Sequence, residues 1–191
     1  MENLDTIELF IDEIDFSDGV NAISLVEMPA IEENFVSLSK QEVQLRTMDE
    51  DKRLVIGLAL VPNKKIYRRS GDYEYNIVFS EETVRKAGEL YLKRLKLHNA
   101  TVGHQESVRG IYLAESWFVD NPEMDKANHY GLNAVKGAWV VALRIENDSV
   151  WQAIKDGQYM GFSIEGFFSE ALSKEISKEE ELMQVILKAI S

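Results

Sequence analysis

Residues 161–166, Gly-Phe-Ser-Ile-Glu-Gly, contain the side chain best suited to act as a nucleophile. In an extended strand Ser163 and Glu165 share one face, while Phe162 and Ile164 share the other. Glycines at both ends allow a second backbone to come close, as a peptide substrate would. A serine that only fills a small polar slot beside a glycine-rich turn would give the same pattern. Glu165 stands where the hydrolase elbow Gly-x-Ser-x-Gly needs glycine, so an α/β-hydrolase is disfavoured.

A serine hydroxyl becomes a good nucleophile only beside a base, and histidine serves best near neutral pH. The chain has three histidines, His98, His104 and His129. His98 lies at an expected helix end, where a cation complements the dipole, and His129 lies in an expected polar loop. His104 directly precedes an expected turn and strand, from which it can reach a cleft. We therefore predict His104 as the base, against the alternative of an ordinary surface histidine.

A histidine base usually has an acidic partner that fixes its tautomer. Glu115 lies in the expected strand 110–119, on the same face as Ile111, Leu113, Trp117 and Val119. Burying an unpaired carboxylate on an apolar face is costly, so this acid needs a partner. The first candidate for that partner is His104, which would make Glu115 the third catalytic residue.

Other pairings fit the sequence as well. Arg109 or Arg144 would make Glu115 one half of a structural ion pair. Glu165, on the face of the candidate nucleophile, is the second choice for the catalytic acid, and Glu27 is the third.

Several other chemistries lack their usual motifs. The sequence has no Gly-Lys-Ser/Thr phosphate loop, no Gly-x-Gly-x-x-Gly and no His-Glu-x-x-His, which disfavours phosphoryl transfer and a zinc site. Cysteine is absent, so covalent catalysis would have to use an oxygen or a lysine. No cofactor is expected.

The charge balance argues against two classes of partner. With 33 acidic and 21 basic residues the chain has a net charge of −12, which repels nucleic acid and anionic lipid. No apolar run approaches the roughly 20 residues that cross a bilayer. The N-terminus is acidic where a secretory signal would be basic. We expect no nucleic-acid or membrane partner and an intracellular protein.

The elements that must position these residues are mainly strands. Apolar runs or alternation predict strands within residues 7–14, 20–30, 54–61, 73–79, 110–119, 137–145 and 159–168. Ser80 is expected to cap a helix, and a shorter helix should run from Asp148 to Gly157. Residues 63–72 are expected to form a loop.

Two segments stand outside this pattern. Residues 37–52 are polar and patternless, which predicts a mobile connector or a weak helix. Residues 171–191 have the spacing of an amphipathic helix. We expect that helix to pack on the domain's own surface, and the alternative is a partner or homo-oligomer contact. The expected division is therefore a domain over 1–170 followed by this helix.

Several separated motifs resemble one known family. They are residues 22–35 (Ala-Ile-Ser-Leu-Val-Glu-Met-Pro-Ala-Ile-Glu-Glu-Asn-Phe), 101–105, 114–126, 136–139 and 161–168. In this order they resemble phage serine proteases of XkdF-like type, which are related to prohead maturation proteases. The resemblance covers most of the chain up to about residue 170.

This resemblance implies a fold and a site. It implies a mainly β, α+β fold with a closed assemblin-like barrel, shared with herpesvirus maturation proteases. It makes His104 the base and Ser163 the nucleophile. In related proteases the acid follows the serine on a later strand, acid-x-Ser-Leu-Val-x-x-Pro-Ala, whereas here the similar string lies at the N-terminus with Ala22 in the acid's place. We therefore hypothesise a circularly permuted barrel whose closing strand comes first, which requires residues 20–26 to lie near Ser163.

The resemblance also implies a biological role. Such enzymes cut scaffold proteins, capsid segments and often themselves inside the immature phage head. The expected location is the host cytoplasm within that head, or the bacterial cytoplasm if a prophage encodes the chain. The alternative is a non-catalytic head-assembly or scaffold-associated protein of similar shape.

Overall fold

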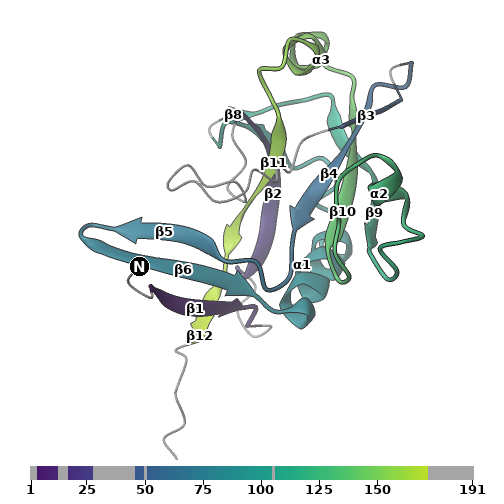
Figure 1. Ribbon diagram of the computed structural model, residues 1–191. Coiled ribbons are helices and arrows are strands. Elements are labelled where there is room, and N and C mark those ends of the chain that lie inside the picture. Colours follow the sequence, from purple (N-terminus) through teal and green to yellow (C-terminus); the bar gives the residue numbers. More distant parts are fainter. Residues whose placement is uncertain (1–3, 13–16, 28–45, 50, 105, 172–191) are drawn as a thin grey trace, which may run out of the picture.

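The computed structural model describes residues 4–12, 17–27, 46–49, 51–104 and 106–171. These residues form strands and three helices, in an α+β arrangement dominated by strands (Figure 1). The strands are β1 (Asp5–Phe10), β2 (Gly19–Val26), β3 (Arg46–Asp49), β4 (Leu54–Leu60), β5 (Ile66–Ser70), β6 (Tyr73–Phe79), β7 (Ala100–Val102), β8 (Glu106–Ser107), β9 (Ile111–Phe118), β10 (Trp139–Ile145), β11 (Gly161–Phe167) and β12 (Ser169–Ala171). The helices are α1 (Glu81–Lys93), α2 (Lys126–His129) and α3 (Asp148–Lys155).

The strands are divided among three four-stranded sheets. Their orders are β12-β1-β6-β5, β3-β4-β10-β9 and β11-β2-β7-β8. Among the described residues none of these sheets closes on itself, so the expected closed assemblin-like barrel is not confirmed. The mainly β, α+β class is confirmed.

The third sheet brings the N-terminal part of the chain beside the segment with the candidate nucleophile. In this sheet β2 pairs antiparallel with β11 on one side and parallel with β7 on the other. Ser163 lies directly opposite Ser24. The proximity required by the permutation hypothesis, residues 20–26 beside Ser163, is therefore present.

Helix α1 helps to hold β2 in place. Ser80 caps the helix as predicted, accepting a hydrogen bond from the Thr83 amide at 3.3 Å. Beyond the end of the helix, Lys96 donates to the Asn21 side chain and to the Val20 carbonyl, the latter at 3.4 Å. Burial lowers the pKa of Lys96, and the nearby charge of Arg94 lowers it further.

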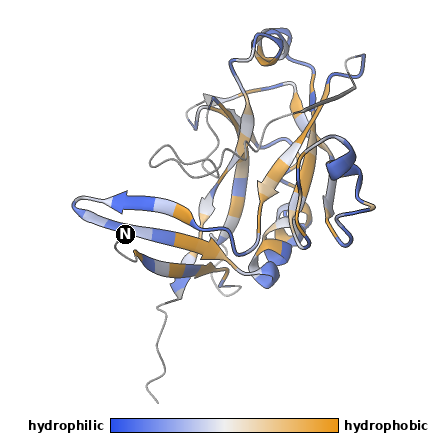
Figure 2. Ribbon diagram, in the orientation of Figure 1, coloured by the Kyte–Doolittle hydropathy of each residue, from blue (hydrophilic) through white to orange (hydrophobic). Residues whose placement is uncertain are grey.

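The core lies between the sheets and α1. Strands β4 and β10 are almost wholly buried and apolar, and Figure 2 shows them as hydrophobic. Phe162 of β11 is 1% exposed and lies against Gly57 of β4, where an added Cβ would come within 2.7 Å of its ring. This contact turns the Phe162 face of β11 inward, so Ser163 and Glu165 lie on the opposite face.

Some predicted segments differ from the structure. Residues 66–70, expected to be loop, form β5, which pairs with β6 across a tight turn at Gly71. The two strands extend away from the rest of the molecule, and Figure 2 shows hydrophilic residues towards their tip. Around Arg68 and Arg69 the sequence therefore lacks the alternation of apolar and polar residues that identifies a half-buried strand.

Two other predictions fall partly or wholly outside the described residues. Of the expected connector 37–52, residues 46–49 form β3 and pair with β4, so the prediction is wrong for those residues. Residues 37–45 and the expected C-terminal helix beyond residue 171 lie outside the described residues. No helix in the described part of the chain is both long and apolar enough to span a membrane.

Candidate active site

His104 lies in the tight turn between β7 and β8, in an unusual backbone conformation. Its φ is 59° and that of Gly103 is 57°, both in the left-handed region. Two hydrogen bonds from the turn to β2 accompany this conformation. The Gly103 amide donates to the Leu25 carbonyl at 2.9 Å, and the His104 amide donates to Ser24 Oγ at 3.0 Å.

The His104 ring contacts an acid from another strand. Its Nδ1 lies 3.1 Å from Oε1 of Glu165 on β11. Thr101 Oγ1, on β7, donates to the same carboxylate oxygen. The side chains of His104 and Glu165 are 43% and 30% exposed, so solvent reaches the pair. A proton on Nδ1 completes the bond to the carboxylate and leaves Nε2 as the basic nitrogen.

Ser163 shares a sheet face with this pair. Its register partner on β2 is Ser24, and the partner of Ser24 on β7 is Thr101. Residues directly opposite one another project on the same face, so the three hydroxyl residues form a row across the sheet beside Glu165. Ser163 is 5% exposed. Among the described residues no hydrogen bond joins Ser163 to His104.

Glu115 is placed elsewhere. Its carboxylate forms an ion pair with Lys126, and the Lys126 ammonium also lies 4.1 Å from the centre of the Trp117 ring. Among the described residues Glu115 forms no hydrogen bond or ion pair with His104, Arg109 or Arg144.

The predicted face of Glu115 was also wrong. In the β9–β10 ladder Leu113 pairs with Leu143 and Glu115 with Ala142, so Ala114 is an extra residue, a β-bulge. A bulge reverses the alternation beyond it, which puts Glu115 on the face opposite Leu113.

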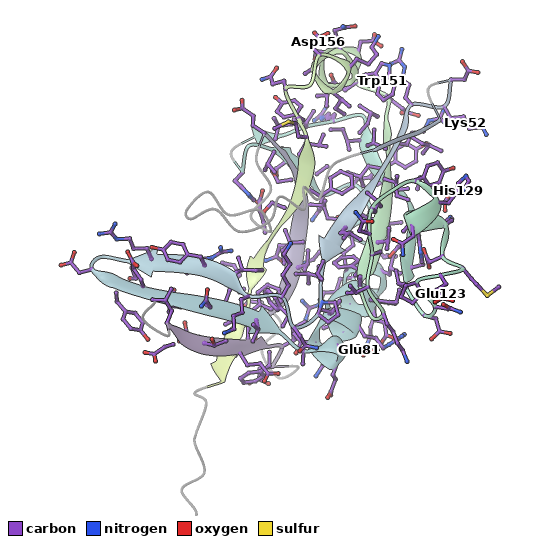
Figure 3. All side chains as sticks on the ribbon, in the orientation of Figure 1. Lys52, Glu81, Glu123, His129, Trp151 and Asp156 are labelled. Atoms are coloured by element: carbon purple, nitrogen blue, oxygen red, sulfur yellow. The ribbon has the colours of Figure 1, made fainter. Side chains whose placement is uncertain are left out.

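The remaining sequence candidates make no hydrogen bond or ion pair with His104 or Glu165 among the described residues. Glu27 is exposed just past the end of β2. His98 lies beside Tyr112, with ring centroids 5.8 Å apart. His129 ends the short helix α2, where Figure 3 labels it. Within the described ranges no group of three or more His, Asp or Glu side chains is placed to hold a metal ion.

Two residues of this site were not predicted from the sequence. Ser24 bonds to the turn and Thr101 bonds to Glu165, and neither was singled out as a candidate within the motifs 22–35 and 101–105. The one signal was a serine inside the apolar run Ala-Ile-Ser-Leu-Val, where a fully buried hydroxyl needs a partner.

The comparisons with known proteins give a family. A family model described as "Putative phage serine protease XkdF" matches residues 42–171, more than half of the 191-residue chain. The chain belongs to this family. The region matched to the XkdF family includes His104, Ser163 and Glu165 and begins after β2, so Ser24 lies outside it. Searches of curated proteins and of solved structures gave no match.

Proposed function

We propose that this chain is a serine endopeptidase in which Ser163 is the nucleophile, His104 the base and Glu165 the acid that orients the base. The observation that carries the proposal is the 3.1 Å contact between His104 Nδ1 and Glu165 Oε1, on the face of the sheet that presents Ser163. Membership of a phage serine protease family supports the same reaction class. Glu165 replaces Glu115 as the third residue because Glu115 is paired with Lys126.

The proposed mechanism depends on His104 Nε2, the ring nitrogen that does not contact Glu165. With Nδ1–H donating to Glu165, Nε2 of His104 accepts the proton from Ser163 Oγ as the oxygen attacks a peptide carbonyl. The imidazolium then gives that proton to the leaving amine, which departs and leaves an acyl-enzyme. Water, deprotonated by the same nitrogen, hydrolyses the ester and restores Ser163. Glu165 stabilises the charged ring in both steps without taking the proton itself.

The hydrogen bond between base and nucleophile must form when substrate binds, because none joins Ser163 to His104 among the described residues. Ser24 bonds to the His104 backbone and lies opposite Ser163, and opposed residues place their Cβ atoms about 4.5–5.5 Å apart. Ser24 therefore lies between the His104 turn and Ser163 in the sheet. Catalytic hydrogen bonds are often long or unformed before substrate binds.

The proposed substrates are scaffold and capsid proteins of an immature phage head, with self-cleavage as a further reaction. The motifs in residues 22–35, 101–105 and 161–168 support this choice through their resemblance to prohead proteases. The pairing of β2 with β11 supports a permuted relative of those enzymes, because a closing strand supplied first would lie there. We place the reaction inside the head, in the host cytoplasm.

A second candidate function is a non-catalytic assembly protein with the same architecture. Two observations favour it: Ser163 is 5% exposed, and no hydrogen bond joins it to His104 among the described residues. Such a protein would bind scaffold without cutting it.

Incubation of the purified full chain with its scaffold and capsid proteins separates the two functions. Wild type, Ser163→Ala and Ser116→Ala are compared by gel and mass spectrometry. Ser116 is a matched control because its hydroxyl accepts a hydrogen bond from Trp139 Nε1 at 2.8 Å in a different sheet. The proposal predicts cleavage by wild type and Ser116→Ala and none by Ser163→Ala. Processing by none of the three favours the assembly protein, and equal processing by all three contradicts Ser163 as the nucleophile.

A further inference from the structure

Ser24 is a fully buried polar residue in the centre of the site sheet. It is 0% exposed and lies on β2, between β11 with Ser163 and β7 with Thr101. Burying a hydroxyl is unfavourable unless it is hydrogen-bonded. Its described partner is the backbone amide of His104, at 3.0 Å.

The conformation of His104 needs such a partner. A non-glycine residue at φ 59° is strained by contact between its Cβ and its own backbone. Conformations of this kind persist only where the surroundings hold them. The Gly103 bond to Leu25 holds one side of the turn, and the Ser24 hydroxyl holds His104 itself.

The backbone conformation of His104 determines the direction in which its imidazole ring points. In the observed conformation the ring reaches Glu165, which comes from β11 on the far side of β2. If the turn relaxed to an ordinary negative φ, the Cβ of His104 would leave the sheet along a different vector. Both the Glu165 contact and the approach to Ser163 would then be lost.

From these contacts we infer that Ser24 is a positioning residue of the protease. Its hydroxyl stabilises the left-handed turn conformation that orients the His104 ring towards Glu165 and Ser163. This inference rests on the proposed function. Ser24 is not itself the nucleophile, because its oxygen is fully buried and already accepts the His104 amide, whereas Ser163 retains some exposure.

The first test is independent of catalysis. Hydrogen exchange of the His104 amide is measured by NMR in the full chain, with Ser163→Ala present throughout to prevent self-cleavage. Adding Ser24→Ala should accelerate exchange at His104 by about tenfold, the effect of losing one hydrogen bond. Adding Ser116→Ala should leave it unchanged. An unchanged His104 exchange rate in the Ser24 variant overturns the inference.

The second test separates positioning from folding. In the otherwise wild-type chain, Ser24→Ala should lower kcat at least tenfold with KM nearly unchanged, as expected for misdirection of one catalytic group. Ser24→Cys keeps a weak acceptor of similar size and should recover part of kcat. Folded fraction is checked by circular dichroism, so that only folded protein is compared.

The outcomes distinguish this inference from the proposed function. Wild-type kcat in folded Ser24→Ala, while Ser163→Ala is inactive, overturns the role of Ser24 and leaves the protease proposal standing. Cleavage that survives Ser163→Ala overturns both. Complete loss in Ser24→Ala together with full activity of Ser163→Ala would make Ser24 the nucleophile and also overturns both.

Discussion

His104 Nδ1 and Glu165 Oε1 lie 3.1 Å apart although their residues are 61 positions apart in the chain. The contact is made across β2, because β11 carries the acid and β7 leads into the turn that carries the histidine. The site therefore depends on a strand from the N-terminal part of the chain, which contributes no residue to the proposed triad.

Glu165→Gln should lower kcat/KM about 100-fold or more, because the amide cannot stabilise the imidazolium that forms during the reaction. Glu115→Gln is the matched control and should retain near wild-type activity, because its carboxylate contacts Lys126. Both pairs are part-exposed, so each change should alter the free energy of unfolding by less than about 1 kcal/mol. Steady-state kinetics on a peptide substrate provides the measurement. The reverse ranking of the two variants would identify Glu115 as the acid.

Ala22 lies directly opposite Glu165 on β2 and on the same face of the sheet. In the resemblance to prohead proteases, Ala22 occupies the position of the acid. A carboxylate placed there would start one strand closer to the His104 turn. We therefore expect the double variant Glu165→Ala, Ala22→Asp to be at least about tenfold more active than Glu165→Ala alone, as one restored acid–base interaction allows. Ala22→Asn in the same background is the control, and equal recovery by Asp and Asn would contradict the prediction.

Gly166 sets how closely β11 and β2 approach at their bulge. A Cβ at this position would lie 2.2 Å from the Gly19 carbonyl oxygen, and a backbone atom cannot rotate away. Gly166→Ala should cost about 3 kcal/mol or more of unfolding free energy, the upper range for overpacking. Gly157→Ala, with a φ of +76° but open space around it, should cost only about 1–2 kcal/mol. Urea denaturation compares the two, and similar costs would be inconsistent with the observed strand contact.

Tyr91 should make stability depend on pH under alkaline conditions. Burial raises the pKa of its hydroxyl above the ordinary value of about 10, and the side chain is 2% exposed. Above pH 10 the unfolded chain loses this proton while the folded chain keeps it, so the unfolded state binds fewer protons and stability falls as pH rises. The contribution is complete below pH 10 and declines by up to about 1.4 kcal/mol per pH unit towards the folded pKa.

Tyr91→Phe removes the titrating group and isolates its effect from the other tyrosines and the lysines. It also removes a 3.1 Å hydrogen bond to the Asn99 carbonyl, at a cost of about 1 kcal/mol that is independent of pH below 10. Thermal unfolding from pH 8 to 11 should therefore show a shallower decline for the variant. Parallel curves would refute the assignment.

Elements whose sequence signals lie within one short stretch of the chain were predictable from the sequence. Helix α1 has a capping serine, acidic residues in its first turn and apolar spacing, and it forms where these predict. The candidate nucleophile and base were chosen from the chemistry of their residue types, and their catalytic roles stay predictions. Strand β5 was missed because only Ile66 is buried on this extended hairpin, so the regular burial that creates alternation is absent there.

The partner of the base was not predictable in the same way. Choosing Glu115 assumed regular alternation along β9, and one inserted residue at Ala114 reverses that alternation. Choosing Glu165 would have required the pairing of β11, β2 and β7, which depends on contacts far apart in sequence. The role of Ser24 required the same information together with the left-handed φ of His104.

Covalent labelling of the nucleophile tests the central claim most directly. A fluorophosphonate probe is incubated with the full chain, and the modified peptide is identified by mass spectrometry. We predict one adduct, on Ser163, with a labelling rate that falls at least about 100-fold in His104→Ala because the oxygen loses its base. Folded wild-type protein that shows no adduct on Ser163, or the same labelling rate without His104, would contradict the account.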